Sequence, residues 1–367
     1  MKVLHLFAAG GTGGIEVLFR NIVLQSKNIE NICGFMFQEG NIYEELKKSD
    51  VKTFSVKNLR YRDKIKYISK YCLDNSIDVI VMHHGGLNCN RIYIKLKKVL
   101  ERTNIKFIRY MHACFDFKAF GMGKNFIKNV LIKNRMQKAI DCSDYIIYIS
   151  EASKRSFENN FKIHINGKVI YNGISGKFYE NVPIRNVEKN FGKIVYIGRL
   201  NKIKGVHLLI EATERLIKKN KDIYLTVVGD GEERRRLEKM VIDRKIEKNV
   251  KFLGRRDDVI EILDKNEIFV YPSTWEEGFG ISVVEAMARG CIPITFKKGG
   301  LVEIIQDGVN GFIVNNTESV ELAEKIDYAI NYKEKREIID NAIESVKKYS
   351  IDDTILNLEN IIKELIR

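Results

Sequence analysis

Short apolar runs alternate with longer amphipathic stretches along the whole chain. Such alternation is typical of βαβ units, in which parallel strands are covered by helices. Apolar runs predict a first set of strands at 3–7, 32–37, 79–82, 105–111 and 145–149, and a second set at 194–197, 224–228, 250–253, 268–271, 292–296 and 311–314. The pattern therefore predicts an α/β protein built from two doubly wound parallel sheets.

The two sets of strands are separated by a polar segment at roughly 175–193, which contains Pro183, one of only three prolines. This composition is typical of a linker, and a chain of 367 residues fits two domains better than one. We predict a first Rossmann-like domain over 1–178 and a second over 188–350, with residues 351–367 forming a helix that crosses back to the first. Ligands of doubly wound sheets bind outside the carboxyl ends of the strands, so we expect the chemistry in a cleft that the two domains face.

The composition narrows the possible partners. A net charge of +14 and a pI of about 9.3 predict a surface that attracts phosphates, nucleic acid or an anionic membrane. The six cysteines show neither a C-x-x-C pair nor zinc-ligand spacing, which favours reduced thiols and a cytoplasmic location. No apolar run approaches the roughly 18 residues needed to span a bilayer, so we expect at most peripheral contact with the inner face of a membrane.

The stretch EEGFGISVVEAMARG, residues 276–290, carries the most informative chemistry. Glu277 and Glu285 flank a glycine-rich turn, and a helix that begins near Ile281 would place Glu285 in its second turn. Free backbone amides at a helix N-terminus favour an anionic or hydroxylated ligand. Because an ionised carboxylate only accepts hydrogen bonds, the two glutamates suit the hydroxyls of a sugar. An ordinary helix that follows a glycine turn also explains the pattern.

Two further loops are expected at strand ends. The loop GRLNKIKG places Arg199 and Lys204 where they could hold a diphosphate, although a solvated basic loop has the same composition. Gly229 and Gly231 follow another strand, where small residues permit close approach of a ligand. A plain tight turn explains these glycines nearly as well.

In this order and spacing, the segments resemble the retaining, nucleotide-sugar-dependent glycosyltransferases of family four, which have the GT-B fold. The segments that carry the resemblance are GGTGGIE, YMHA, DYIIYISEASK, VIYNGIS, GRLNKIKG, VVGDGEE, FLGRRDDV, EEGFGISVVEAMARG and GGLVEIIQDGVNGFIV. They run from residue 10 to residue 314 and match best in the second half.

The resemblance implies roles for individual residues. Arg199 and Lys204 would neutralise the diphosphate, Glu277 would hold hydroxyls of the transferred sugar, and His112 would reach the same sugar from the other domain. The donor-binding residues would be Gly13, Gly14, Gly229, Arg255, Gly278, Phe279, Gly280 and Glu285, the last through the ribose hydroxyls.

The implied reaction is the retaining, metal-independent transfer of a hexose or N-acetylhexosamine to a lipid-linked or polysaccharide acceptor, in the synthesis of a cell-surface glycan. A nucleotide diphosphate sugar is the expected donor, a UDP-sugar more than a GDP-sugar, and no other cofactor is expected. Positive charge placed at the leaving diphosphate could replace a metal ion, and the chain has no D-x-D triplet to hold one. The departing phosphate would accept the proton of the acceptor, so no protein base is assigned.

Two alternatives remain open at this point. A nucleotide-sugar epimerase would share the GT-B fold, and the basic charge would permit a nucleic-acid-binding protein, although no nucleic-acid-binding module is found. A nicotinamide-dependent dehydrogenase is disfavoured because Glu16 occupies the position of the third glycine of G-x-G-x-x-G.

Two other features could contact the acceptor. The segment 123–140 interleaves apolar residues with lysines, as expected of a helix on an anionic membrane or of one that packs on the sheet. His83 and His84 follow a predicted strand, and because neighbouring strand residues point to opposite faces, at most one should line the acceptor side.

Overall fold

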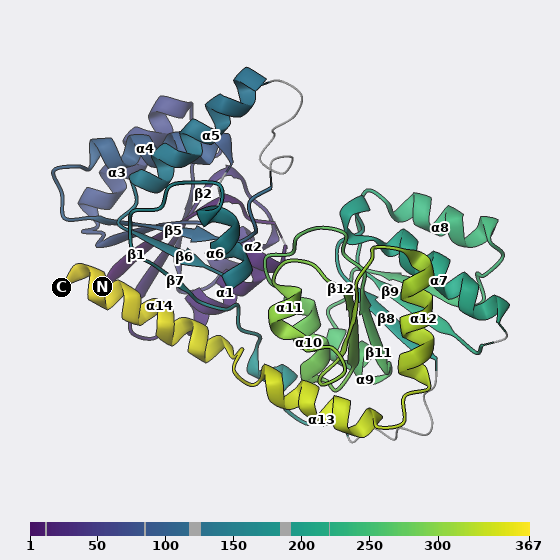
Figure 1. The fold of residues 1–367 in the computed structure, drawn as a ribbon. Helices are drawn as coiled ribbons and strands as arrows, with labels where there is room; N and C mark the ends of the chain where they lie inside the picture. The colour runs from purple at the N-terminus through teal and green to yellow at the C-terminus, as the bar shows by residue number, and fades with distance from the viewer. Residues whose placement is uncertain (12, 84–85, 117–125, 184–191, 220) are drawn as a thin grey trace. The chain divides into compact units, whose positions relative to one another are not determined.

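The computed structural model describes residues 1–11, 13–83, 86–116, 126–183, 192–219 and 221–367. The chain forms two compact units, one of Met1–Gly173 with Ile351–Arg367 and the other of Ile174–Ser350. Each unit is a parallel β-sheet covered by helices on both faces (Figure 1). The predicted α/β class is therefore confirmed.

Unit 1 contains a seven-stranded sheet of order β3-β2-β1-β4-β5-β6-β7, in which every neighbouring pair is parallel. Its strands are β1 (Lys2–Ala9), β2 (Glu30–Gln38), β3 (Lys52–Ser55), β4 (Val79–Met82), β5 (Lys106–Met111), β6 (Tyr145–Tyr148) and β7 (Gly167–Val169). All five predicted strands are confirmed. The sequence pattern missed β3 and β7, because these short edge strands have few buried positions and carry no apolar run.

The helices of unit 1 are α1 (Gly14–Gln25), α2 (Asn41–Lys47), α3 (Tyr61–Asp74), α4 (Leu87–Val99), α5 (Phe126–Asp141), α6 (Glu151–Glu158) and α14 (Ile351–Ile366). Figure 1 shows α3, α4 and α5 over one face of the sheet and α1 and α14 over the other. The strand order reverses between β1 and β4, and in a doubly wound sheet this reversal is where ligands bind.

The C-terminal helix α14 packs on unit 1. The carboxylate of Glu359 accepts hydrogen bonds from Ser26 Oγ at 2.7 Å and Asn28 Nδ2 at 2.7 Å. Thr354 Oγ1 donates to the carbonyl of Tyr171 at 2.9 Å. These polar contacts fix the helix beside an apolar face in which residues such as Ile362 are fully buried.

Unit 2 contains a six-stranded parallel sheet of order β10-β9-β8-β11-β12-β13. Its strands are β8 (Lys193–Ile197), β9 (Tyr224–Val228), β10 (Val250–Gly254), β11 (Ile268–Tyr271), β12 (Ile292–Phe296) and β13 (Phe312–Val314). All six strands predicted for the second half are confirmed, and the order reverses between β8 and β11.

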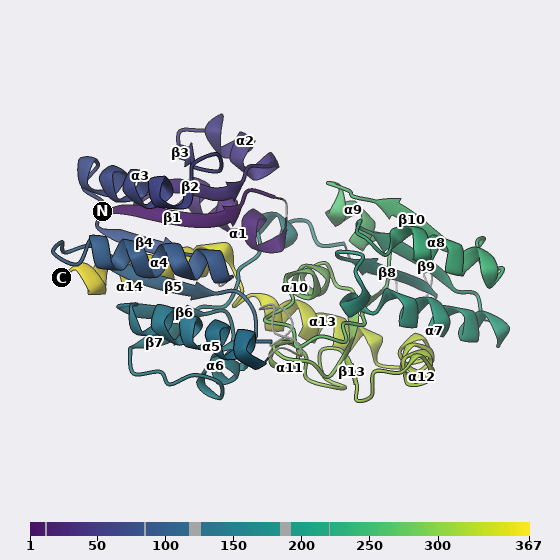
Figure 2. The same ribbon diagram turned by 90° about the horizontal axis from the view of Figure 1, so that it is seen from above.

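The helices of unit 2 are η1 (Gly176–Phe178), η2 (Lys202–Lys204), α7 (Val206–Lys218), α8 (Arg234–Asp243), α9 (Val259–Asp264), α10 (Ile281–Ala288), α11 (Leu301–Ile304), α12 (Ser319–Ile330) and α13 (Lys335–Val346). In Figure 2, α7 lies beside α8 and α12.

The first unit ends at Gly173, before the expected residue 178. The chain beyond Gly173 is hydrogen-bonded within unit 2, because Ile174 N donates to the carbonyl of Tyr349 at 2.9 Å. The buried guanidinium of Arg289 also donates to the carbonyl of Glu180 at 2.6 Å. Residues 184–191 of the expected linker lie outside the described residues.

The six cysteines are free thiols, and all but Cys142 are buried. Burial raises the pKa of the Cys72 thiol to about 12, which keeps it protonated and inert. Every helix in the described ranges is too short or too polar to serve as a membrane span.

Candidate functional site

The loop after β8 packs closely against the segment that follows β11. Gly205, which precedes α7, has a left-handed backbone with φ of 68°, and a Cβ atom there would lie 2.0 Å from the carbonyl oxygen of Pro272. The backbone N–H of Thr274 donates to the carbonyl of Ile203 at 2.9 Å. This close backbone packing places Lys204, the last residue of η2, beside residues 271–277.

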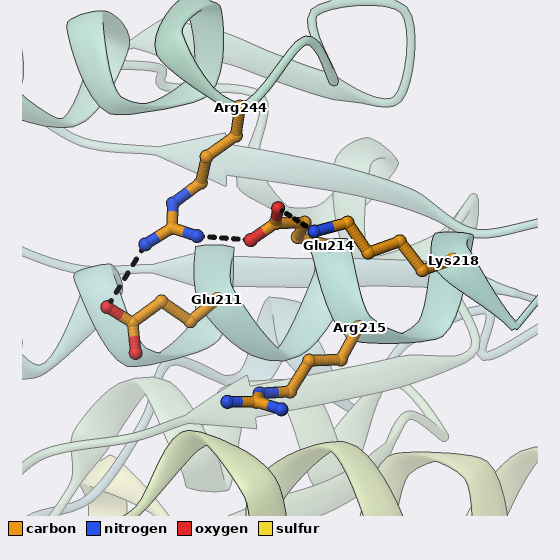
Figure 3. Close-up of a pocket in the computed structure, with 5 residues that line it drawn as sticks. All are labelled: Glu211, Glu214, Arg215, Lys218 and Arg244. Atoms are coloured by element: carbon orange, nitrogen blue, oxygen red, sulfur yellow. Dashed lines mark hydrogen bonds and ion pairs between the residues drawn. The ribbon is translucent and has the colours of Figure 1, made fainter.

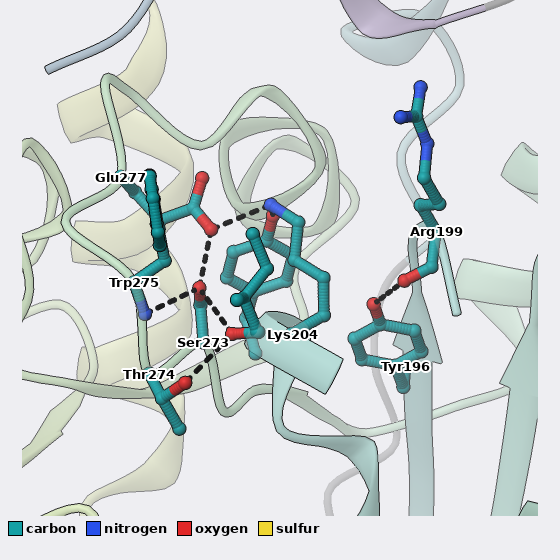
Figure 4. A network of polar contacts seen from close by, with 9 residues as sticks. Tyr196, Arg199, Lys204, Ser273, Thr274, Trp275 and Glu277 are labelled. Atoms are coloured by element: carbon teal, nitrogen blue, oxygen red, sulfur yellow. Dashed lines mark hydrogen bonds and ion pairs between the residues drawn. The ribbon is translucent and has the colours of Figure 1, made fainter. Parts of the chain in front are cut away.

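Lys204 and Glu277 form a partly buried ion pair. Lys204 Nζ lies 2.6 Å from Glu277 Oε1 and 2.6 Å from the hydroxyl of Tyr271, and it lies 5.0 Å from the centroid of the Tyr271 ring. Ser273 Oγ donates to the same Glu277 oxygen (Figure 4). The side chains of Lys204 and Glu277 are 18% and 11% exposed, so solvent screens the attraction only in part.

The described contacts of Lys204 do not use all of its N–H donors. An ammonium group has three N–H donors, and the described residues occupy two of them, through Glu277 and Tyr271. Sequence reasoning predicted Lys204 and Glu277 but missed Tyr271 and Ser273. Tyr271 ends β11 and Ser273 follows it, and their closeness to Lys204 depends on β11 lying next to β8, which local sequence patterns do not encode.

The backbone of Glu277 is held by a second glycine loop, which follows β12. Gly300 N donates to the Glu277 carbonyl at 2.7 Å, and a Cβ atom on Gly299 would lie 2.1 Å from that oxygen. Gly299 N also donates to a carboxylate oxygen of Glu276 at 2.8 Å. In the sequence this GG pair belongs only to a segment that carries the family resemblance, whereas in the structure it packs against the backbone of Glu277.

Helix α10 begins at Ile281, as predicted, and Gly280 before it has a φ of 123° that favours glycine. Glu285 lies in the second turn and is half-buried. Burial raises the pKa of Glu285 to about 8. A pKa near this value favours the protonated carboxyl at neutral pH, which can donate as well as accept, whereas the sequence suggested an ionised group that only accepts.

The side chain of Arg199 points away from the Lys204–Glu277 ion pair. It is exposed, and its backbone carbonyl accepts a hydrogen bond from the hydroxyl of Tyr196 at 3.0 Å. In Figure 4 its guanidinium points away from Lys204 and Glu277. Of the three expected catalytic side chains of unit 2, the structure thus brings together Lys204 and Glu277, and Arg199 points away from them.

Gly229 at the end of β9 is required by backbone packing. Its φ is 128°, and a Cβ atom would lie 1.9 Å from the carbonyl oxygen of Gly198. A Cβ atom on Gly231 would similarly lie 2.2 Å from the carbonyl oxygen of Leu200. These contacts favour the tight-turn explanation of both glycines, which the sequence left open beside ligand approach.

Arg255, just after β10, is exposed near Asp230. The pKa of the Asp230 carboxyl is lowered by the hydrogen bond from the amide of Gly231, and the charges of Arg234 and Arg255 contribute to the shift. Arg255 therefore lies close enough to Asp230 for the two charges to interact.

The expected phosphate loop of unit 1 lies at the start of α1. The helix begins at Gly14, and Gly13 before it is extended, with no side chain to cap the first turn. The carbonyl of Gly13 accepts from Val17 N at 3.0 Å. The neighbouring Thr12 lies outside the described residues.

His112 follows β5 and is half-buried, with its ring stacked on Tyr110 at a centroid distance of 4.5 Å. Its Nε2 lies 3.0 Å from Nδ1 of His83, whose side chain is only 2% exposed. The possibility that His83 lines an open acceptor side is therefore wrong, because the ring is buried in the core. His84 lies outside the described residues.

Figure 3 shows a hollow elsewhere on unit 2. Its lining residues are Glu211, Glu214, Arg215, Lys218 and Arg244. Arg244 pairs with both glutamates, and Lys218 pairs with Glu214 at 2.6 Å. Because none of the predicted site residues lines it, this hollow is a poor candidate for the donor site. Within the described ranges, no cluster of three or more His, Cys, Asp or Glu residues is arranged to hold a metal ion.

Comparison with known proteins relates this geometry to a family. The family model for glycosyl transferases of group 1 matches residues 179–346. An uncharacterized glycosyltransferase of Methanocaldococcus jannaschii is 30% identical over 96% of this chain and 95% of its own length. A lipopolysaccharide 1,2-N-acetylglucosaminetransferase of Salmonella typhimurium is 24% identical over 90% of this chain and 82% of its own.

Among solved structures, that of HepE from Anabaena in complex with UDP-glucose has the same fold. It superimposes with a TM-score of 0.81 at 23% sequence identity, covering 99% of this chain and 100% of that chain.

Proposed function

Because the chain belongs to the glycosyl transferases of group 1 and has the GT-B fold, we propose that it is a retaining enzyme of family four. In this proposal it moves a hexose or N-acetylhexosamine from a UDP-sugar to a lipid-linked or polysaccharide acceptor during synthesis of a cell-surface glycan. The complex of HepE with UDP-glucose and the name of the Salmonella relative support this substrate class. The observation that carries the proposal is the partly buried Lys204–Glu277 pair at the carboxyl ends of β8 and β11.

Lys204 is proposed to stabilise the leaving diphosphate. The bond between the anomeric carbon and the phosphate oxygen breaks, and negative charge develops on that oxygen. The third N–H of Lys204 donates to the diphosphate, and the exposed guanidinium of Arg199 adds a second positive charge. Such preorganised charge is usually the largest single contribution to catalysis.

The acceptor hydroxyl attacks the anomeric carbon on the face that the phosphate leaves. Its oxygen forms the new glycosidic bond, and its proton passes to the departing phosphate oxygen. The anomeric configuration is retained, and the reaction requires no general base from the protein. In this proposal it also requires no metal ion, because Lys204 and Arg199 supply the positive charge.

Glu277 is proposed to hold the transferred sugar, together with the backbone of Gly278, Phe279 and Gly280. Its carboxylate, already oriented by Ser273, accepts hydrogen bonds from sugar hydroxyls. Glu285 is proposed to accept hydrogen bonds from the ribose hydroxyls, and its raised pKa favours a protonated form that can also donate to them.

The other predicted residues complete the donor site in this proposal. Gly13 and Gly14 let the phosphates approach the start of α1, Gly229 keeps the β9 loop compact, and Arg255 borders the base. His112 contacts the transferred sugar from unit 1.

The acceptor proposal includes a peripheral contact with an anionic membrane. The C-terminal half of α5 packs on the sheet, since Met136 and Ile140 are buried. In the N-terminal half, by contrast, Phe126 is 77% exposed, Ile127 72% and Leu131 58%, among exposed lysines. An apolar surface flanked by positive charge suits the interface of an anionic bilayer, where lipid-linked acceptors lie.

A labelled-donor assay tests the proposal. The protein is incubated with radiolabelled UDP-hexoses and UDP-N-acetylhexosamines in the presence of a lipid extract, and the products are separated. We expect label in an acceptor, with the anomeric configuration of the donor. An epimerised free donor without labelled acceptor, or a product of inverted configuration, would contradict the proposal. A rise in melting temperature on addition of UDP reports donor-site binding without any acceptor.

A further inference from the structure

Two buried tyrosines of unit 2 contact opposite ends of the β8 loop, residues 198–205. Tyr196 belongs to β8 and is fully buried, and Tyr271 is the last residue of β11 and is 5% exposed. Their rings lie within 12° of parallel at a centroid distance of 6.1 Å. Because β8 and β11 are neighbours in the sheet, the two tyrosines form a stacked pair next to the loop.

The hydroxyl of Tyr196 holds the start of the β8 loop. It donates to the backbone carbonyl of Arg199 at 3.0 Å (Figure 4). A Cβ atom on Gly198 would lie 2.6 Å from the hydroxyl oxygen, so a larger residue at that position would displace one of them. Tyr196 therefore fixes the backbone from which the exposed Arg199 side chain extends.

The hydroxyl of Tyr271 holds the end of the same loop. Its oxygen lies 2.6 Å from Lys204 Nζ, and Nζ lies 5.0 Å from the centroid of the Tyr271 ring. An ammonium group only donates hydrogen bonds, so Tyr271 is the acceptor. The hydroxyl and the ring together contact Lys204 through a hydrogen bond and a cation–π interaction.

Both phenols are neutral. Burial raises the pKa of Tyr196 well above its usual value, and burial together with the negative charge of Glu277 raises the pKa of Tyr271 in the same way. A neutral phenol orients an ammonium group without cancelling its charge. Tyr271 thus restrains Lys204 and leaves its positive charge available for a ligand.

This restraint matters because a lysine side chain is long and flexible. Ordering it when a ligand binds would cost conformational entropy, and this cost is avoided where the side chain is held in place beforehand. In the proposed function Glu277 also binds the transferred sugar. Tyr271 is a second anchor for Lys204, and it has no role of its own in the reaction.

We propose that Tyr196 and Tyr271 are positioning residues, which hold Arg199 and Lys204 at the two ends of the β8 loop where they bind the diphosphate of the donor. The contacts of the two tyrosines lie within unit 2, whereas the role toward the diphosphate rests on the proposed function.

Tyr271→Phe is the first test. The substitution retains the ring beside Tyr196 and Lys204 and removes only the hydroxyl. We expect kcat for transfer from a UDP-sugar to fall about tenfold, with a smaller change in KM for the donor, because the charge on the diphosphate develops as the bond breaks. Thermal melting identifies a temperature at which the variant is folded. Wild-type kcat in the folded variant would overturn the role of Tyr271.

A double-mutant cycle separates positioning from packing. In Lys204→Ala the hydroxyl of Tyr271 has no ammonium group to orient, so addition of Tyr271→Phe should lower kcat/KM by less than about twofold. A packing defect would act independently of Lys204 and would lower kcat/KM by the same factor in both backgrounds. Equal factors would therefore overturn the positioning role of Tyr271.

The same cycle pairs Tyr196→Phe with Arg199→Ala. Alone, Tyr196→Phe should lower kcat/KM about 3- to 10-fold, as expected for one hydrogen bond between neutral groups, and it should have little further effect in Arg199→Ala. Independent effects of the two substitutions would overturn the role of Tyr196.

Tyr93→Phe is the matched control. The hydroxyl of Tyr93 is also buried, and it is hydrogen-bonded to Ser143 Oγ at 2.9 Å in unit 1. Its removal should lower the melting temperature and leave kcat/KM unchanged. A loss of kcat/KM equal to that of Tyr271→Phe would show that removal of any buried hydroxyl is sufficient, which would overturn the inference.

The parent variants distinguish failure of the inference from failure of the proposed function. If Lys204→Ala and Arg199→Ala transfer sugar normally, the proposed contact with the diphosphate is wrong, and the inference is wrong with it. If both variants lose activity but neither tyrosine substitution does, only the positioning role is wrong.

Discussion

Lys204 Nζ lies 2.6 Å from Glu277 Oε1, although 73 positions separate the two residues in the sequence. The pair depends on two adjacent strands, because Lys204 follows β8 and Glu277 follows β11. In the proposed mechanism each residue contacts a different part of the donor, the lysine the diphosphate and the glutamate the sugar. Their direct contact means that a substitution at one also changes the environment of the other.

Lys204→Ala tests the diphosphate role. Loss of one preorganised donor typically lowers kcat by about 100- to 1,000-fold, and we expect a fall of that size in transfer from a UDP-sugar. Lys202→Ala is the matched control, because Lys202 belongs to the same short helix η2 but is exposed. Steady-state kinetics with a fixed acceptor provide the measurement. Equal activity of the two variants would remove Lys204 from the mechanism.

Gly205→Ala tests whether the packing of the β8 loop positions Lys204. A left-handed alanine costs about 1–2 kcal/mol by itself, and at Gly205 the new Cβ atom would also clash with the carbonyl of Pro272. We expect the free energy of unfolding to fall by more than about 2 kcal/mol and transfer to fall with it. Gly308→Ala is the control, since Gly308 has a φ of 75° but no atom within 4 Å of a Cβ position.

The sequence predicted the alternation of strands and helices well because buried parallel strands appear as uninterrupted apolar runs. It missed β3 and β7, which lie at a sheet edge with few buried positions. It also missed Tyr271, because a contact between neighbouring strands depends on strand order, which local patterns do not encode. The contact between His83 and His112 was missed for the same reason. The protonation of Glu285 depends on burial, so the sequence alone suggested an ordinary carboxylate.

Glu285 should make stability depend on pH. A glutamate in an unfolded chain has a pKa of about 4.3, whereas burial raises the pKa of Glu285 to about 8 in the folded protein. Between these values the folded state binds more protons than the unfolded state, so the free energy of unfolding falls as pH rises. The contribution is fully present below about pH 4 and is lost as pH rises through about 8.

Glu285→Gln should remove that dependence, because its side chain is neutral at every pH. Urea unfolding of wild type and variant at about pH 5 and about pH 9 measures the effect. We expect the wild type to lose more stability than the variant between the two values. The exposed Glu232, changed to Gln, is the control and should leave the wild-type dependence intact. An identical pH dependence in wild type and Glu285→Gln would show that the carboxyl is ionised in the folded protein.

Removal of divalent metal tests the proposed source of positive charge. If Lys204 and Arg199 neutralise the diphosphate, transfer should persist in excess EDTA with protein purified in chelator. Initial rates with and without added magnesium or manganese provide the measurement. A rate that falls to background in EDTA and returns with either metal would contradict the metal-independent mechanism.

The exposed half of α5 should bind anionic membranes. Phe126 and Ile127 expose most of their apolar surface, and burial of one such side chain in a bilayer contributes about 1.5–3 kcal/mol. Replacement of both with serine should therefore weaken binding to vesicles of phosphatidylglycerol and phosphatidylcholine by at least about tenfold, as measured by sedimentation. Leu356→Ser on α14 is the control, because Leu356 is 54% exposed but lies outside α5. Equal binding of wild type to neutral and anionic vesicles, or an equal loss in both variants, would show that α5 is not the membrane contact.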